Sequence, residues 1–368
     1  MIATTIKDLI HHLETTAPPA LQEEYDNSGL LVGDENTLLN GILIALDCTE
    51  AVIAEAIKNE CNIVVCHHPI LFKGIKRLNG KNYIERIIIQ AIKNNIAIYA
   101  IHTNLDNVLF NGVNGRIGKL LGITPSSVLI PKENEILKLQ TYVPKSHAEA
   151  VLQAMITAGA GTIGNYSECS FQLEGKGTFK GNSTSQPFIG NQLELTTINE
   201  IKIEILVPKY SKQKVLNALL ASHPYEEVAY DLIALQNTTS TLGAGAFGEL
   251  EQAMEATEFL SWLKLKMNLK VIKHTCLHKK MIKKIAWCGG AGALLIASAK
   301  ACKADVYITS DVKYHEFFDA DQQLIIIDIG HYETEQYTTD LLYDVIYEKF
   351  STFALRKTSV NTNPINYF

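Results

Sequence analysis

The chain has 368 residues, 47% hydrophobic and 20% charged, which is the composition of a folded globular protein rather than a disordered one. Its formal net charge of −6 argues against a bulk electrostatic hold on nucleic acid, so an anionic ligand would need a metal ion or a local basic patch. No apolar run reaches the roughly 18 residues that span a bilayer, and the first ten residues do not resemble a signal peptide, so no membrane association is expected.

The length is typical of two or three domains rather than one. The seven cysteines are odd in number and include no CxxC pair, which indicates neither a disulfide framework nor a thiolate zinc site. Reduced, buried thiols in a cytoplasmic protein are the simplest interpretation.

The first part of the chain alternates between short apolar runs and helical segments. Strands are expected at Gly41–Asp47, Asn62–Cys66 and Ile96–Ile101, and helices at Thr49–Glu60, Tyr83–Asn94 and Gly112–Leu121. Thr49 suits the cap of the first of these helices. Continuous apolar strands separated by helices predict a parallel or mixed sheet that is covered on both faces.

The middle of the chain contains an internal echo. From Leu137 the sequence reads LKLQTYVPKSHAEAVLQAMITAG, and from Ile201 it reads IKIEILVPKYSKQKVLNALLASHP. Each segment is an alternating strand, a Val-Pro, a serine and then an amphipathic helix. Two such strand–helix units predict a ferredoxin-like module inserted between the halves of the main domain.

The last third returns to the strand–helix rhythm. Strands are expected at Met281–Cys288, Asp305–Thr309 and Leu324–Asp328. A glycine-rich turn, Gly289–Gly292, follows the first of them, and Tyr332–Phe350 has the apolar spacing of a helix. Neither this turn nor Gly243–Gly248 matches a complete phosphate-binding motif, so both are interpreted as tight turns.

Three predicted strand ends carry side chains of the kind that bind metal ions. His67 and His68 directly follow one strand, and Asp106 follows another in the sequence HTNLD. His331 and Glu335 follow the strand LIIID, four residues apart and therefore on one face of a helix start. Loops meet at the carboxyl edge of such a sheet, so these five residues are expected to lie together.

Each of these features alone has a plain structural explanation. His67 and His68 could belong to an ordinary capped loop, Asp106 could be a helix cap, and the last pair could be a solvated first turn. Their joint occurrence at three strand ends favours a metal site. Three imidazoles and two carboxylates without a thiolate suit Zn, Mn or Fe. Five ligands suit two ions with open positions, whose excess positive charge would favour an anionic substrate such as a phosphate ester or nucleotide.

Five stretches of the chain together form a specific pattern: YDNSGLLVG (25–33), CHHPILF (66–72), HTNLD (102–106), SDVKYHE (310–316) and GHYETE (330–335). In these stretches the chain resembles the NIF-three-like proteins, which are often labelled GTP cyclohydrolase I type 2 homologues. The middle segment, with HPYEEVAYD (223–231), is similar to the insert of the longer bacterial members, whose fold is similar to PII and CutA proteins. Asp26 and Asn27 in the first stretch are equally well explained by support of the site or by turn formation.

The resemblance implies an α/β fold in which residues 1–128 and 246–368 form a two-part metal-binding domain and residues 129–245 a PII/CutA-like insert. It implies two divalent ions per chain, held by His67, His68, Asp106, His331 and Glu335, and a ring-shaped homohexamer. His102 is then expected beside the ligands or facing the substrate. For His315, contact with a substrate and ordinary packing after a strand are both open.

Two functions follow from these expectations. The first is a metal-dependent hydrolase of a nucleotide or another phosphate-bearing small molecule, and the family label suggests opening of the GTP imidazole ring. The second is a non-catalytic metal- or ligand-binding hexamer in which the insert has a regulatory role. The acidic charge balance disfavours a nucleic-acid-binding function.

Overall fold

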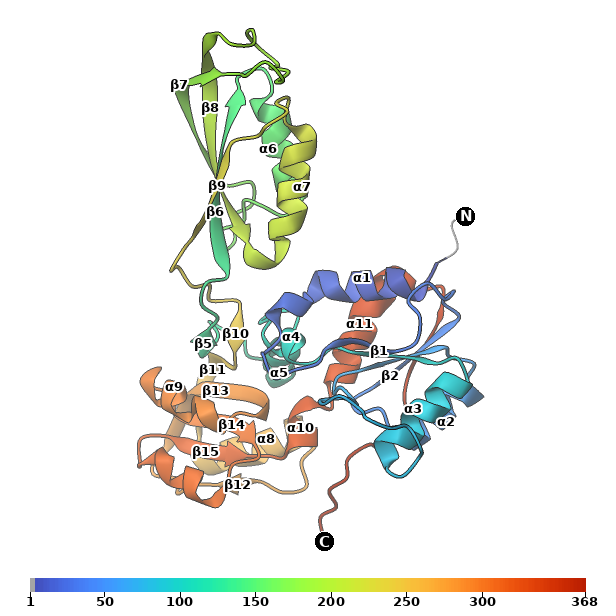
Figure 1. Ribbon diagram of the computed structural model, residues 1–368. Coiled ribbons are helices and arrows are strands. Elements are labelled where there is room, and N and C mark those ends of the chain that lie inside the picture. Colours follow the sequence, from blue (N-terminus) through green and yellow to red (C-terminus); the bar gives the residue numbers. More distant parts are fainter. Residues whose placement is uncertain (1–3) are drawn as a thin grey trace. The chain divides into compact units, whose positions relative to one another are not determined.

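Buried β-branched residues dictate the central strands of the first sheet. A computed structural model describes residues 4–368 (Figure 1), in which every residue of β2 (Gly41–Ala45), β3 (Ile63–Cys66) and β4 (Ala97–Ala100) is buried. The sheet order is β1 (Gly29–Val32), β4, β3, β2 and β16 (Ala354–Lys357). β1 is antiparallel to β4, whereas the other neighbours pair in parallel, so the predicted mixed sheet is confirmed.

Helices cover both faces of this sheet, as continuous apolar strands require. The helices of this part are α1 (Ile6–Thr16), α2 (Glu50–Lys58), α3 (Tyr83–Lys93), α4 (Thr103–Asp106) and α5 (Val113–Leu121), with a 3₁₀ turn η1 at Pro19–Leu21. The predicted cap is confirmed, because the Thr49 side chain accepts a hydrogen bond from the backbone N–H of Val52. α2 and α3 pack on one face, where Val52, Ile53 and Ile87 join the apolar core.

A second sheet is formed by the last third of the chain. Its order is β11 (Ala246–Glu255), β13 (Met281–Ala291), β14 (Val306–Ser310), β15 (Ile325–Asp328) and β12 (Lys273–His274). Its helices are α8 (Ala256–Lys266), α9 (Ile296–Ala301), α10 (His331–Glu335) and α11 (Thr338–Phe350), with 3₁₀ segments η3 (Ala293–Leu295) and η4 (Tyr314–Ala320). The three strands predicted here are confirmed: β14 and β15 are fully buried, and β13 is buried in part.

Two local predictions for this part were wrong. Gly289–Gly292 is not a separate turn, because β13 continues to Ala291 through a register shift between Trp287 and Ala291, which is a bulge in its pairing with β14. The single helix predicted for Tyr332–Phe350 is two helices, α10 and α11, with a break at Gln336 and Tyr337. Apolar periodicity continues across that break, so the sequence pattern does not reveal it.

One apolar core joins the two sheets. Residues of the first sheet such as Ile44 and Tyr99 belong to the same cluster as Trp287 and Ile327 of the second. The C-terminal strand β16 strengthens the connection, since it pairs with β2 at the edge of the first sheet. Residues 1–131 and 240–368 accordingly form one compact unit. A short ladder of β5 (Ile130–Pro131) with β10 (Gly243–Ala244) also lies in this unit.

Residues 132–239 form a second compact unit, which is described here by itself. Its elements are β6 (Ile136–Pro144), α6 (Ala148–Thr157), β7 (Ser170–Lys180), β8 (Leu195–Pro208), a 3₁₀ turn η2 (Lys209–Ser211), α7 (Lys212–Ser222) and β9 (Tyr230–Ala234). The antiparallel sheet has the order β7–β8–β6–β9, and α6 and α7 pack on one face of it (Figure 1). Both strand–helix units of the sequence echo are present.

The described helices are all too short or too polar to cross a membrane. With these helices and several separate sheets, the protein has a mixed α/β fold.

Candidate metal centre

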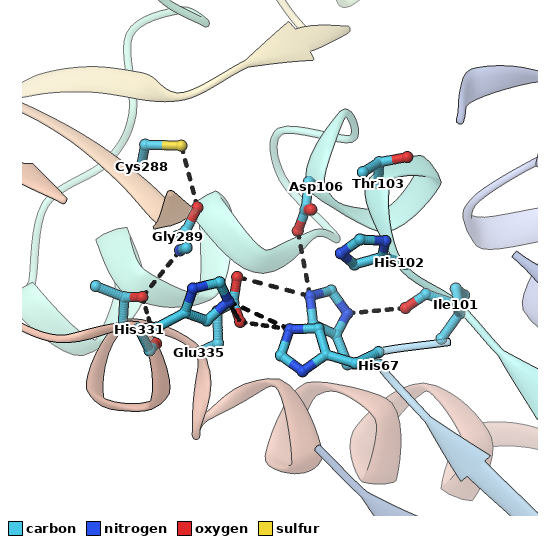
Figure 2. Close-up of polar contacts among 12 residues, drawn as sticks. His67, Ile101, His102, Thr103, Asp106, Cys288, Gly289, His331 and Glu335 are labelled. Atoms are coloured by element: carbon cyan, nitrogen blue, oxygen red, sulfur yellow. Dashed lines mark hydrogen bonds and ion pairs between the residues drawn. The ribbon is translucent and has the colours of Figure 1, made fainter. Parts of the chain in front are cut away.

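The five residues singled out at the strand ends lie together in the unit formed by residues 1–131 and 240–368. His67 and His68 follow β3, Asp106 ends α4 after β4, and His331 and Glu335 begin and end α10 after β15. Figure 2 shows His67, Asp106, His331 and Glu335 pointing toward one another. The first and second sheets each supply ligand-type side chains, so the cluster depends on the core that joins the sheets.

Glu335 is the centre of the cluster, and its two oxygens face different histidines. Oε2 lies 2.9 Å from Nε2 of His68 and 3.0 Å from Nε2 of His331. Oε1 lies 3.9 Å from Nε2 of His67, and that nitrogen lies 3.5 Å from Oδ1 of Asp106. The side chains thus divide into two neighbouring groups that share one carboxylate.

Each histidine of the cluster is held through Nδ1, so that Nε2 faces the centre. Nδ1 of His67 lies 2.8 Å from the carbonyl oxygen of Ile101. Nδ1 of His68 lies 2.7 Å from Asp47, and Nδ1 of His331 lies 2.5 Å from Asp311. Histidines that bind metals are oriented in this way, because an acceptor at one ring nitrogen leaves the lone pair of the other free for the ion.

His102 repeats the same arrangement at the side of the cluster. Its Nδ1 lies 2.8 Å from Oδ1 of Asp26, and its ring centroid lies 5.3 Å from that of His67 and 5.4 Å from that of His68. The Asp26 carboxylate is buried and also accepts hydrogen bonds from the backbone N–H and hydroxyl of Thr103. His102 is therefore fixed with Nε2 as its available nitrogen.

Two buried atoms of the cluster have no hydrogen-bond partner among the described residues: Nε2 of His67 and Oδ1 of Asp106. Unpaired buried polar atoms are costly and uncommon, so a pair of them facing each other needs an explanation. A cation between the imidazole and the carboxylate would satisfy both atoms. Ligand-type atoms of His67, His68 and His102, and likewise of His68, His331 and Glu335, are close enough together to hold an ion. The residues present therefore fit a metal.

The buried carboxylates of the cluster also need a positive charge beside them. Burial lowers the pKa of His67 to about 3, so this imidazole is neutral. Burial and the nearby Glu335 hold the pKa of Asp106 well above its usual range. Burial acts against the charged form of His68, yet hydrogen bonds to Asp47 and Glu335 raise its pKa to about 10. Without a metal ion, a proton on this imidazole supplies part of the charge that the buried carboxylates require.

Glycines in the β13 bulge allow α10 to approach the strand closely. A Cβ atom at Gly290 would lie 2.3 Å from Oε1 of Glu335, and the Gly290 backbone has a φ of +67°. The Gly290 N–H donates to the hydroxyl of Thr334 at 2.9 Å. Asn114 of α5 fastens the other side, donating to the carbonyl of Asp106 and accepting from the N–H of Gly289. The Gly-rich segment thus positions Glu335.

His315 is not joined to the cluster by any contact of the described residues. It is exposed on η4, where its ring packs against Tyr314 and Phe318. These contacts agree with ordinary packing after a strand, and contact of His315 with a substrate stays a prediction.

Two acidic residues that hold histidines of the cluster, Asp47 and Asp311, were not among the predicted site residues. Asp311 directly follows β14 and Asp47 lies two residues after the end of β2, so the rule that selected ligand-type residues at strand ends would also have found them. Asp311 has a φ of 56°, a conformation uncommon for a residue other than glycine and often found at functional sites. Thr362 gave no signal, and its hydroxyl donates to the second oxygen of Asp47 at 2.7 Å.

The fold and the cluster define an α/β protein with histidine and carboxylate side chains that could hold a metal ion. The model of the Duf34/NIF3 (NGG1p interacting factor 3) family matches residues 4–364. The chain belongs to this family, as its sequence motifs indicated.

Known relatives agree with this assignment. A "GTP cyclohydrolase 1 type 2 homolog" of Bacillus subtilis is 38% identical over 328 residues, covering 89% of this chain and 88% of the relative. A protein of the same description from Halalkalibacterium halodurans is 38% identical over 364 residues, covering 98% of both chains. The crystal structure of a Bacillus cereus protein related to NIF3 matches with a TM-score of 0.88 and 35% identity over the full length of both chains.

Proposed function

We propose that this protein is a metal-dependent hydrolase with two divalent ions per chain, acting on a nucleotide or another phosphate-bearing small molecule. The observation that carries the proposal is the division of the cluster by Glu335. One ion would be held by His67, Asp106 and Oε1 of Glu335, and the other by His68, His331 and Oε2. Zn, Mn and Fe all accept such a set of nitrogen and oxygen donors.

Three protein ligands at each position would leave coordination sites open, as catalytic centres require. Divalent ions at such a centre supply Lewis-acid activation of water and of an anionic substrate. The side chains of the protein would hold the reacting groups in place and transfer protons. His102 is the best placed proton acceptor, since Asp26 fixes its Nδ1 and leaves Nε2 free beside His67 and His68.

The name of the relatives extends the proposal to GTP. Proteins described as GTP cyclohydrolase 1 type 2 homologues are 38% identical to this chain, so hydrolytic opening of the guanine imidazole ring is the first reaction to test. Phosphate monoesters, phosphodiesters and other nucleotides complete the panel.

A metal analysis tests the centre itself. Protein purified without added metal is measured by mass spectrometry beside the variants His68→Ala and His11→Ala; His11 is an exposed histidine of α1. We expect about two equivalents in the wild type, as in two-metal hydrolases, and a loss in the His68 variant alone. The absence of metal, also after incubation with Zn, Mn or Fe, would contradict the proposal.

The reaction is tested next with the metal-loaded protein on the panel, with Asp106→Ala as the inactive control. Turnover that disappears in this variant supports a hydrolase. If no compound is converted although two ions are bound, the second candidate function gains weight: a non-catalytic hexamer that binds metal or a ligand.

We propose that the unit of residues 132–239 has a regulatory role, whether the protein is a hydrolase or a non-catalytic binding protein. Its β-α-β-β-α-β order is the ferredoxin-like arrangement, and we propose that it is an inserted domain similar to PII and CutA proteins. We further propose that the protein is a cytoplasmic homohexamer. The mass of the particle in solution, by light scattering, tests the assembly.

A further inference from the structure

A basic loop follows the two histidines of the cluster and has no role in the centre described above. It comprises residues 73–81, KGIKRLNGK, with four cations: Lys73, Lys76, Arg77 and Lys81. No acidic residue occurs between His68 and Glu85, although the chain as a whole carries a net charge of −6. The loop is therefore a local reversal of the protein's charge.

The four cations have no partner within the described part of the chain. Among residues 4–368, no ion pair or side-chain hydrogen bond is formed by Lys73, Lys76, Arg77 or Lys81, whereas the neighbouring Arg86 pairs with Glu50 at 2.8 Å. All four side chains are exposed. Like charges this close repel one another, so an anion that binds among them relieves the repulsion.

The loop is attached to the centre at its beginning. The ring of Phe72 packs edge-on against that of His102, with centroids 5.9 Å apart, and the side chain of Asn27 donates to the carbonyl of Leu71 at 2.6 Å. Lys76 is four residues beyond Phe72, so its Cα lies within about 14 Å of that of Phe72. An extended lysine side chain covers part of this distance.

The other end of the loop is attached to α3. The carboxylate of Glu85 accepts hydrogen bonds from the backbone N–H groups of Asn79 and Lys81. Between the two attachments, residues 73–78 form no backbone–backbone hydrogen bond among the described residues. Gly74 has open space where a side chain would be, so the middle of the loop can move without breaking internal structure.

We propose that this loop binds the phosphate chain of the substrate while the metal centre holds the group that reacts. This inference rests on the proposed function and narrows its substrate to compounds with two or more linked phosphates, such as a nucleoside triphosphate. Several lysine and arginine side chains on one short segment suit a chain of adjacent phosphates, because each phosphate adds charge and acceptor oxygens. A single phosphate would be held by the centre alone and would gain little from the loop.

The experiment measures the affinity of the metal-loaded full chain for inorganic tripolyphosphate by titration calorimetry. The test variant is Lys73→Ser/Lys76→Ser/Arg77→Ser. Its control is Lys58→Ser/Lys93→Ser/Lys266→Ser, which removes three exposed lysines that have no ion pair among the described residues. Both variants change the net charge equally, so long-range attraction is matched. The metal content and the unfolding midpoint of each variant, compared with those of the wild type, show whether the variant still folds.

We expect the test variant to bind tripolyphosphate about tenfold or more weakly, and inorganic phosphate almost as well as the wild type does. The control variant should bind tripolyphosphate and inorganic phosphate like the wild type. Lys73→Arg/Lys76→Arg, which keeps the positive charge, should also bind tripolyphosphate like the wild type. Equal affinity of the wild type and the test variant would overturn the inference, as would an equal loss in the control. Tighter binding of a short single-stranded oligonucleotide than of tripolyphosphate would overturn it too.

The two proposals fail in different ways. Loop-dependent binding of tripolyphosphate without turnover of any compound would refute the hydrolase and leave the phosphate site standing. Turnover of a compound by the wild type, together with an unchanged affinity of the test variant for tripolyphosphate, would support the hydrolase and refute the phosphate site.

Discussion

The carboxylate of Asp47 links His68 to the C-terminal segment of the chain. Its Oδ1 lies 2.7 Å from Nδ1 of His68, and its Oδ2 accepts a hydrogen bond from the hydroxyl of Thr362. Thr362 follows β16, the edge strand that the C-terminal segment adds to the first sheet. The orientation of one proposed metal-binding imidazole therefore depends on a residue 315 positions from Asp47.

Replacement of these supporting residues should weaken metal binding without removing a ligand. We expect Asp47→Asn to lower the metal affinity by about 10- to 100-fold, the usual effect of changing an acceptor behind a metal-binding histidine. Thr362→Val should have a smaller effect in the same direction. Competition with a chromophoric chelator measures both affinities. Thr157→Val, which removes an exposed hydroxyl bound to Gln153 of the other unit, is the control; an equal loss there would disprove the link.

Gly290 should not tolerate a side chain. Gly290→Ala places a methyl group against Glu335 and adds the strain of a left-handed backbone, about 1–3 kcal/mol. Gly122→Ala is a matched control, because Gly122 has a φ of +68° but nothing within 4 Å of its Cβ position. Denaturant unfolding should show a loss in both variants, and metal analysis a loss in Gly290→Ala only. Full metal content in Gly290→Ala would show that the bulge does not position Glu335.

Asn114 should be important for stability, since it bridges α4 and β13. Asn114→Leu leaves the N–H of Gly289 and the carbonyl of Asp106 without their partner, which costs about 1–3 kcal/mol for a buried group. The free energy of unfolding, measured by urea titration of metal-free protein, should fall by this amount. Asn40→Leu, at an exposed asparagine bound to the carbonyl of Glu60, should change it by about 0.5 kcal/mol or less.

Asp26 should give a defined dependence of stability on pH. Burial would raise the pKa of Asp26, but hydrogen bonds from His102 and Thr103 prevail and hold it well below the ordinary value of 3.8. A carboxyl with a depressed pKa in the folded state stabilises the protein above the unfolded pKa and loses this contribution as the pH falls toward the folded pKa. The stability advantage of the wild type over Asp26→Asn should therefore be constant near neutral pH.

Below about pH 4 this advantage should shrink, because the unfolded carboxyl takes up a proton first. Urea midpoints of both proteins at pH 6, 5, 4 and 3 provide the comparison. A difference that stays constant down to pH 3 would mean that the variant loses packing or neutral hydrogen bonds rather than a charged group.

The sequence predicted the parts of the fold that have local signals. Strand ends with histidine or carboxylate directed attention to His67, His68 and Glu335. The structure brings these residues together, but β3 and β15 belong to different sheets, and it is the shared apolar core rather than one common edge that places them side by side. The buried strands and the two strand–helix units of the middle were predicted from periodicity alone.

Other features depend on contacts between distant residues, and no local pattern reports them. β16 has the sequence ALRK, which is short and half polar, and it becomes a strand only by pairing with β2. The sequence left Asp26 open between support of the site and turn formation, and only the fold places His102 beside it. The bulge in β13 resembles a turn because glycine permits either, and only the approach of Glu335 shows which one forms.

The contribution of the C-terminal segment to the first sheet also determines when the centre can be completed during synthesis. His67 and His68 leave the ribosome early, with β3 but without Glu335, β16 or Thr362. Domains generally fold as units, from the N-terminus onward. Asp47, the acceptor of His68, precedes it in the chain, but β16 and the Thr362 hydroxyl that binds Asp47 are added only near the end of synthesis. A metal ion at the proposed centre would consequently gain its full set of ligands only after Glu335 has emerged.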